Sequence, residues 1–478
     1  MKYVSTRDGN EAKREFSFLD AVLEGLAPDG GLLVPESIPT VSPSELEAWK
    51  IMSYQEICFH VIRKFCPIEE VPDSELKRMI SSAYSSTFEM TEIAPSVSVG
   101  DVAIMELFHG PTFAFKDVAL QLLGQLFDYA LRVRNGRMTI LGATSGDTGS
   151  AAIAGVKGRS NIDCVILFPL GKTSRVQELQ MTSNLDKNIH CLGVLDSVFD
   201  DCQSIVKACF NDAQFNEEMS LGAVNSINWA RIMAQIVYYI YASLKADGGP
   251  VTFVVPTGNF GNILAGYYAQ RMGLPIAHLV IASNSNDILP NFFKNGQYKI
   301  RSKVVPTMSP SMDIAVSSNF ERYLYDLFGR DGKVTAEKFN QLKTSGEFAV
   351  TQDELATCQE IFSAIAVDES HTLQTIKDVF QKHTYLLCPH SAVGYAAAQE
   401  YLQSNPGTNV VTLATAHIGK FTEHILSNLG DSENEFRDAV INSVPEKLRE
   451  LEKAETRRHD ICNSVEEVKK FLRTHIKQ

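Results

Sequence analysis

The sequence has few of the features that mark secreted, membrane-spanning or metal-stabilised proteins. Its nine cysteines are odd in number and scattered, and they form no CxxC pair. That pattern favours reduced thiols over a disulfide framework or a zinc ribbon. No segment approaches the roughly 18 uninterrupted apolar residues of a membrane-spanning helix. The opening stretch MKYVSTRDGNEAKREF lacks the apolar core of a signal peptide and is too acidic for a transit peptide. We therefore expect a cytoplasmic protein that does not contact a membrane.

Positive charge is also scarce. Lys and Arg number 44 against 57 for Asp and Glu, which gives a formal net charge of −13. Such a surface repels nucleic acids and anionic lipids at long range. We therefore expect no nucleic-acid partner, and an anionic small molecule would have to be bound by a local cluster of donors.

The chain is long enough for about three compact units at roughly 150 residues each. Residues 1–92 combine Pro-rich loops with amphipathic helices expected over 54–64 and 73–86, and we interpret them as a cap domain. Residues 93–430 are predicted to form a two-lobed core. Residues 431–478 are strongly charged, and Pro445 and a capping box starting at Ser464 predict helices in this C-terminal extension.

The core repeats a short β-branched run, a Gly/Ser/Thr turn and a longer helical period, which is typical of parallel βαβ units. The runs are continuously apolar rather than alternating, so we expect strands covered on both faces. The fold class is therefore α/β with mostly parallel sheets. The clearest predicted strands are 138–142, 164–169, 251–256, 278–283, 385–389 and 410–414.

Two of these runs end in Gly-rich turns, ATSGDTGS at 143–150 and TGNFGN at 257–262. A helix that starts at such a turn presents its first N–H groups to an anion, and glycine permits close approach. Neither turn carries the lysine of a Walker motif or a GxGxxG pattern, which disfavours ATP and dinucleotides. Ordinary βα turns explain either turn equally well at this level.

Lys116 lies between Phe115 and the aliphatic stretch VALQLLGQLF. Apolar surroundings lower the pKa of a lysine and suit it to form a Schiff base. A lysine at a helix start with its amine in solvent is the plainer alternative. Together with two anion cradles, Lys116 suggests pyridoxal phosphate acting on an amino acid.

Longer motifs carry a family resemblance. They include ELFHGPTFAFKD at 106–117, TSGDTGSAA at 144–152, NSINWARIMAQIVYY at 225–239, PTGNFGN at 256–262, PSMDIAVSSNFER at 310–322 and LATAHIGKF at 413–421. With these motifs the chain resembles the threonine synthase family of pyridoxal-phosphate enzymes, fold type II. The family's usual AHPAKF reads AHIGKF here, with Ile418 and Gly419 in place of Pro and Ala.

The resemblance implies a lyase with pyridoxal 5'-phosphate that converts O-phospho-L-homoserine and water to L-threonine and phosphate by β,γ-elimination and water addition. It also implies a monomer or homodimer. Two alternatives stay open. A catabolic phospho-lyase of the same family would release 2-oxobutyrate, although the retained Pro111 favours the synthase. An inactive homologue acting as a sensor or scaffold is disfavoured by the retention of Lys116 and Thr415.

The resemblance also implies roles for individual residues. Lys116 would carry the cofactor, Thr415 would face its pyridine nitrogen, and Asp147 would lie beside its 3-hydroxyl. The phosphate loop would comprise Gly258, Asn259, Phe260, Gly261 and Asn262, and the substrate-carboxylate loop Thr144, Ser145, Gly146, Thr148 and Gly149.

The substrate's own phosphate needs a second anion site. The loop FPLGKTSR at 168–175 follows a predicted strand, and Lys172 and Ser174 are the first candidates within it. An exposed basic loop is the alternative, in which case Arg231 or Lys420 would bind that phosphate. His109, His390 and His417 lack metal-ligand spacing, so we expect hydrogen-bonded histidines and no metal.

Overall fold

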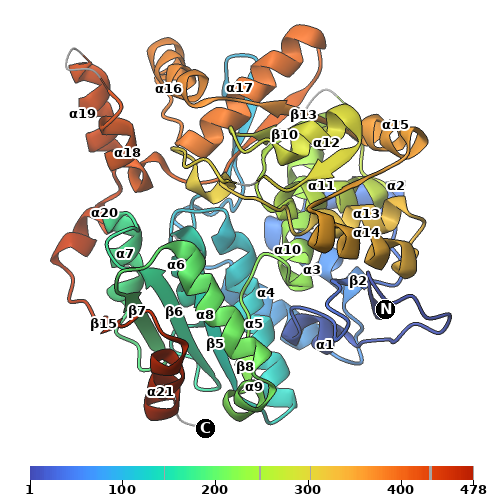
Figure 1. The fold of residues 1–478 in the computed structure, drawn as a ribbon. Coiled ribbons are helices and arrows are strands. Elements are labelled where there is room, and N and C mark those ends of the chain that lie inside the picture. The colour runs from blue at the N-terminus through green and yellow to red at the C-terminus, as the bar shows by residue number, and fades with distance from the viewer. Residues whose placement is uncertain (145, 247–248, 302, 430–432, 477–478) are drawn as a thin grey trace.

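Two mostly parallel sheets organise the fold, as the alternation of apolar runs and turns predicted. The computed structural model describes residues 1–144, 146–246, 249–301, 303–429 and 433–476. The sheets lie in separate lobes with helices packed around each (Figure 1). This is the α/β architecture with mostly parallel sheets that the sequence predicted.

The larger sheet has six strands in the order β13-β10-β9-β14-β4-β3, and only the β3/β4 pair is antiparallel. The helices α11 (Gly261–Arg271) and α17 (Pro389–Ser404) pack against its central strands. Its strands are β3 (Ser96–Val99), β4 (Val102–Glu106), β9 (Val251–Pro256), β10 (Ile276–Ser283), β13 (Phe362–Ala366) and β14 (Val410–Ala414).

The smaller sheet has five parallel strands in the order β15-β7-β6-β5-β8. In β6 (Ile162–Pro169), Val165 and Leu167 join one apolar cluster while Cys164 and Ile166 join another. Alternate side chains therefore enter two cores, which explains why the strand is continuously apolar. The other strands are β5 (Met138–Ala143), β7 (Ile189–Val194), β8 (Leu221–Gly222) and β15 (His459–Ile461).

The helices α5 (Lys116–Val133) and α6 (Asp147–Val156) pack backbone to backbone in this lobe. A Cβ added to Gly124 would lie 2.0 Å from the carbonyl oxygen of Gly155, and one added to Gly155 would lie 2.5 Å from that of Leu120. Glycine is therefore required at both positions. The close packing fixes the first residues of both helices, Lys116 and Asp147, relative to each other.

The first 92 residues wrap around α5 and α10 (Trp229–Lys245). Capping boxes at Ser17, Ser42 and Ser53 define three helix starts. The elements are β1 (Tyr3–Ser5), α1 (Phe18–Leu23), β2 (Leu33–Pro35), α2 (Pro43–Trp49), α3 (Tyr54–Phe65) and α4 (Asp73–Ala83).

The C-terminal chain runs along one side of the molecule from the larger-sheet lobe to the smaller one (Figure 1). It forms α18 (Thr422–Leu426), α19 (Asn434–Ser443), α20 (Glu446–Glu450), β15 and α21 (Val465–His475). The sequence predicted only helices here, whereas β15 extends the smaller sheet. Helix α21 begins after Ser464 as predicted, but the Ser464 side chain makes no capping hydrogen bond in the described structure.

The predicted strand at 385–389 is wrong. Thr384 caps α16 (Glu369–His383) in the left-handed conformation, residues 385–388 form an irregular connector, and Pro389 is the first residue of α17. Leu387 and Cys388 are buried there, which accounts for the apolar pattern without a strand. Proline is common at the first position of a helix, so Pro389 indicated a helix start. The prediction gave more weight to the apolar run before it.

The remaining elements connect and cover the two lobes. They are α7 (Arg175–Thr182), α8 (Phe199–Asn211), α9 (Ala213–Met219), α12 (Ile288–Asn295), β11 (Gln297–Lys299), η1 (Pro310–Met312), α13 (Phe320–Leu327), α14 (Gly332–Ser345), β12 (Glu347–Ala349), α15 (Gln352–Ile361), α16 (Glu369–His383), η2 (Ile418–Lys420) and η3 (Leu451–Lys453). No helix within the described ranges is long and apolar enough to cross a membrane.

Candidate active site

Lys116 is the first residue of α5, and its side chain is almost fully buried. Its amine donates a hydrogen bond to Oγ of Ser311 at 3.3 Å and lies 3.7 Å from Oδ2 of Asp147. Burial lowers the pKa of Lys116, Asp147 opposes that shift, and the charges of Lys420 and Arg231 add to it. The amine is therefore biased toward the uncharged form that acts as a nucleophile or a base.

Asp147 lies at the centre of the charged cluster around Lys116. Its Oδ1 accepts a hydrogen bond from the amide of Gln177 at 2.9 Å and lies 2.8 Å from the Lys420 ammonium. Burial alone would raise the pKa of Asp147, but Lys420 and Lys116 hold it well below its usual range. The Lys420 side chain is fully buried and also donates to the carbonyl of Thr112 at 2.6 Å.

The TSGDTG turn precedes α6 and packs closely on α7. Oγ1 of Thr144 accepts hydrogen bonds from the N–H groups of Gly146 and Gly149, each at 3.0 Å. A Cβ added to Gly146 would lie 2.5 Å from the amide of Gln177, so glycine is needed for this approach. Thr148 is half-buried, and Ser145 lies outside the described residues.

The predicted phosphate loop joins β9 to α11. Phe260, just before α11, adopts the left-handed conformation with φ of 62°, and its ring packs against Phe320 and Phe362. A non-glycine residue tolerates that conformation only where its surroundings hold it, which is frequent at functional sites. No side chain caps α11 within the described structure, so its first N–H groups are available to an anion.

Asn262 lies in the first turn of α11. Its Oδ1 accepts hydrogen bonds from the hydroxyls of Tyr238 at 2.6 Å and Tyr239 at 2.8 Å. The two tyrosines fix the orientation of the amide. In the part of the chain that the structure describes, its buried Nδ2 has no hydrogen-bond partner, which is the expected state of a donor reserved for a ligand.

A segment that the sequence left without a role, residues 310–319, covers this loop. Oγ of Ser317 donates to the Gly258 carbonyl at 2.7 Å, and the backbone N–H of Asn319 donates to the Asn259 carbonyl at 3.1 Å. The same segment supplies Ser311, the hydrogen-bond partner of Lys116. It therefore links the phosphate loop to the lysine.

Thr415 follows β14 and lies beside Lys116 in space. The backbone N–H of Phe115 donates to the Thr415 carbonyl at 2.8 Å, and the Thr415 N–H donates to Oγ of Ser391 at 3.2 Å. Four regions distant in sequence, around Lys116, Asp147, Ser311 and Thr415, thus meet at one place.

Lys172 and Ser174 are placed differently. Lys172 lies exposed on the turn between β6 and α7. Ser174 is the N-cap of α7: its hydroxyl accepts from the backbone N–H of Gln177 and donates to the side chain of the same residue. Ser174 is therefore linked to the charged cluster through Gln177, which donates to Asp147.

Arg231, in the first turn of α10, is buried. Among the described residues, its Nε and Nη1 have no hydrogen-bond partner. Burial lowers the pKa of Arg231 to about 10, and a guanidinium at that value is still charged. An unpaired buried charge is costly, so this donor pair indicates an anion-binding position. Arg231 lies in the motif NSINWAR, but the sequence predicted it only as the alternative to Lys172 and Ser174.

The three histidines make the hydrogen bonds expected from the sequence. Nε2 of His390 accepts from the Ser311 N–H at 3.2 Å, and burial lowers the pKa of His390 to about 3. Nδ1 of His417 accepts from the Gly419 N–H, and His109 pairs with Glu106. No cluster of potential metal ligands occurs within the described ranges.

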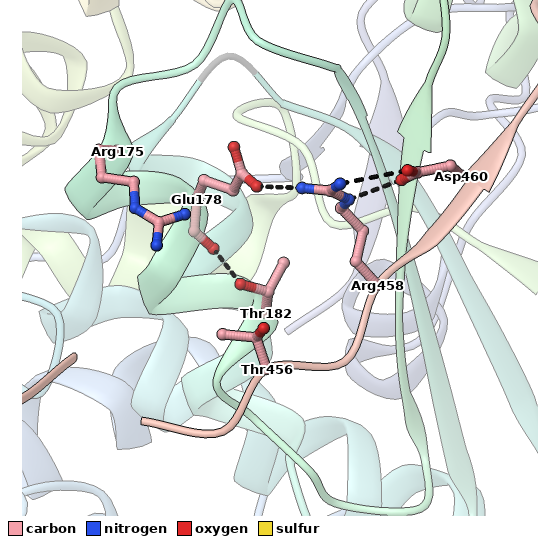
Figure 2. A pocket seen from close by; sticks show the side chains of 6 residues that line it. All are labelled: Arg175, Glu178, Thr182, Thr456, Arg458 and Asp460. Carbon is pink, nitrogen blue, oxygen red and sulfur yellow. Dashed lines mark hydrogen bonds and ion pairs between the residues drawn. The ribbon is translucent and has the colours of Figure 1, made fainter. Parts of the chain in front are cut away.

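A polar pocket of about 320 Å³ lies where the C-terminal chain meets α7 (Figure 2). Figure 2 shows Arg458 between Glu178 and Asp460, and it pairs with both carboxylates. Glu178 follows Gln177 on α7, whereas none of the predicted site residues lines this pocket. Its charged groups therefore hold the C-terminal chain against α7 and lie apart from Lys116.

Comparisons with known proteins cover nearly the whole chain. Residues 2–84 match the family described as threonine synthase N terminus, 89–416 the pyridoxal-phosphate dependent enzymes, and 391–472 the threonine synthase C-terminal family. The threonine synthase of Saccharomyces cerevisiae is 43% identical over 94% of this chain and 93% of its own. The threonine synthase of Pseudomonas aeruginosa is 43% identical over 99% of this chain and 98% of its own. The crystal structure of pyridoxal-phosphate-bound threonine synthase from Brucella melitensis matches with a TM-score of 0.91 and 44% identity over 100% of both chains.

Proposed function

This chain belongs to the threonine synthase family, and from that premise we propose how its residues divide the work of the reaction. The enzyme is a lyase with pyridoxal 5'-phosphate as cofactor, and it converts O-phospho-L-homoserine and water to L-threonine and phosphate. The observation that carries our residue assignment is the buried amine of Lys116, with its lowered pKa, beside Asp147 and Ser311.

Three features of the site fit the cofactor. The amine of Lys116 suits an aldehyde, the uncapped start of α11 suits a phosphate, and the buried Nδ2 of Asn262 lacks a partner in the described structure. We therefore assign Lys116 as the attachment point and residues 258–262 as the phosphate loop. On the resemblance we assign Thr415 to the pyridine nitrogen, where its neutral hydroxyl does not hold that nitrogen protonated as an aspartate would.

The bound cofactor supplies an electron sink for the substrate's carbon chain. Lys116 takes the proton from the substrate Cα through its uncharged amine and moves a proton at Cβ, which loses one hydrogen as phosphate leaves Cγ. We assign the α6 turn, with Thr144, Gly146, Thr148 and Gly149, to the substrate carboxylate, and we include Ser145 there on the resemblance alone. Burial of the cluster excludes bulk water until Cβ is ready for addition.

For the phosphate of the substrate we propose Arg231, because its buried guanidinium has two N–H groups without partners among the described residues. Lys172 and Ser174 stay as the rival assignment. Lys172 is exposed, and Ser174 already caps α7, which favours Arg231.

The division into residues 1–92, 93–430 and 431–478 is also proposed. It is supported by the packing of the N-terminal helices on α5 and α10 and by the C-terminal chain that joins both lobes. A cytoplasmic location is supported by the nine cysteines, all of which are free thiols. The acidic net charge supports the absence of a nucleic-acid partner, and we propose a monomer or homodimer on the resemblance alone.

Product analysis with O-phospho-L-homoserine tests the function. The holoenzyme is expected to release threonine and phosphate in equal amounts. Release of 2-oxobutyrate and ammonia would identify a phospho-lyase instead. The absence of any product, from protein that has bound the cofactor, would identify a sensor or scaffold.

Gly258→Ala tests the phosphate loop. A Cβ at this position would lie 2.8 Å from the Ser311 carbonyl oxygen, so η1 has to move away from the loop. Overpacking of about 1–3 kcal/mol predicts roughly tenfold to hundredfold weaker cofactor binding. The measurement is a titration of apoprotein with cofactor. Gly142→Ala is the matched control, because its Cβ would make only ordinary contact, at 3.5 Å from Ile166. Equal affinity in both variants would contradict the assignment.

A further inference from the structure

Two buried amines share one carboxylate at this site. Lys420 Nζ lies 2.8 Å from Oδ1 of Asp147, and Lys116 Nζ lies 3.7 Å from Oδ2. Lys420 also donates to the Thr112 carbonyl at 2.6 Å, whereas Lys116, among the described residues, donates only to the Ser311 hydroxyl at 3.3 Å. One carboxylate neutralises one ammonium, and Lys420 makes shorter contacts than Lys116 does. Asp147 is therefore the counter-ion of Lys420.

The backbone around Lys420 keeps it in place. It ends η2, whose first residue follows the His417 cap, and Phe113 accepts a backbone hydrogen bond from His417. The Thr112 carbonyl that Lys420 contacts also accepts from Gln180 of α7 at 3.1 Å. Lys420 is therefore held by two contacts, one to the Thr112 carbonyl in the loop before Lys116 and one to Asp147 at the start of α6. It cannot move away from this position without breaking both.

We propose, resting on the proposed attachment of the cofactor to Lys116, that Lys420 is a positioning residue that keeps Asp147 as its own counter-ion and so leaves Lys116 as an uncharged amine. Only the uncharged amine has a lone pair for the aldehyde carbon of the cofactor, and its two hydrogens leave with the aldehyde oxygen as water. Without Lys420, the Asp147 carboxylate would turn to Lys116 and hold it as an ammonium.

The charges around Lys116 support this allocation. Lys420 and Arg231 lower the pKa of Lys116, and Asp147 raises it. Removing Lys420 therefore removes a lowering influence and strengthens the raising one. The ionisable groups that face the cluster from the surrounding elements are Asp117 of α5, Asp147 of α6, Arg231 of α10, His390 of α17 and Lys420 of η2.

The test measures acylation of Lys116 in the apoprotein against pH, with acetic anhydride as the probe and peptide mass spectrometry as the readout. In Lys420→Met, the midpoint for Lys116 is expected to rise by about one to two pH units, which corresponds to a tenfold to hundredfold lower rate below the midpoint. Lys420→Arg keeps the charge and is expected to stay near the wild-type midpoint.

A double variant separates this role from a structural one. In Lys420→Met with Asp147→Asn, neither charge is present, and the midpoint is expected to fall back toward wild type. Asp147→Asn alone is expected to lie below wild type, because the Lys420 charge then acts unopposed. A merely structural lysine would not produce this order. An unchanged midpoint in folded Lys420→Met, or no recovery in the double variant, would overturn the proposal.

The cofactor assignment has its own readout. Borohydride reduction of the wild-type holoenzyme, followed by peptide mapping, is expected to place the cofactor on Lys116. If another lysine is labelled, the site assignment is wrong. If Lys116 is labelled but its midpoint does not respond to Lys420, only the role of Lys420 is wrong.

Discussion

Lys116→Ala is expected to abolish threonine formation, with a loss of at least about four powers of ten. The reason is that one amine performs two tasks, attachment of the cofactor and transfer of protons at the substrate's Cα and Cβ. Steady-state assays with saturating cofactor measure the loss. Addition of the cofactor in excess should not restore activity, because a bound but unattached cofactor still lacks the proton acceptor.

The fold of this variant is expected to survive. Asp147 keeps its ion pair with Lys420 at 2.8 Å and its hydrogen bond from Gln177, so no carboxylate is left unpaired. Circular dichroism and thermal unfolding check this point. Lys157→Ala is a suitable control, because Lys157 is an exposed lysine just after α6. Substantial turnover by folded Lys116→Ala would contradict the catalytic role.

The strands were predictable from the sequence where turn residues mark the ends of an apolar run. The expected bounds at 251–256 and 410–414 coincide with β9 and β14, because apolar β-branched runs there end at turn residues. The run at 385–389 has a similar composition but connects α16 to α17. A short apolar run indicates that a segment is buried, but burial alone does not distinguish a strand from a buried connector.

The site was predictable where one short motif contains the chemistry. Lys116 and the Gly-rich turns could be chosen as candidates from the sequence, although their roles stay proposals. Ser311 and Lys420 could not be linked to Lys116 in this way, since their contacts cross 195 residues from Lys116 to Ser311 and 308 residues from Thr112 to Lys420. Such contacts depend on how the two sheets and their loops pack.

The second large effect is expected at Arg231. Arg231→Met should lower kcat/KM for O-phospho-L-homoserine by about two to four powers of ten, because two charge-assisted hydrogen bonds of about 1.5–3 kcal/mol each are lost. Initial rates below KM measure this change. Arg231→Lys keeps the charge but cannot present two N–H groups in a fork, so its loss should be intermediate.

The thermal stability of Arg231→Met distinguishes a role of Arg231 in substrate binding from a role in the fold. Nε and Nη1 of Arg231 have no partner within the described structure, so a methionine of similar length removes a buried charge and breaks no hydrogen bond of these atoms. The thermal midpoint of the apoprotein is therefore expected to be unchanged or higher. A strongly lowered midpoint would show that Arg231 serves the fold instead.

Comparison with Lys172→Ala decides between the two phosphate assignments. Because Lys172 is exposed, its loss should change kcat/KM by less than about threefold, in line with a surface charge. A loss of one to two powers of ten in Lys172→Ala, with little change in Arg231→Met, would reverse the assignment in favour of the 168–175 loop. The cofactor titration supplies the third outcome: if Arg231→Met weakens cofactor binding as much as it lowers kcat/KM, the guanidinium binds the phosphate of the cofactor and the substrate's phosphate needs another partner.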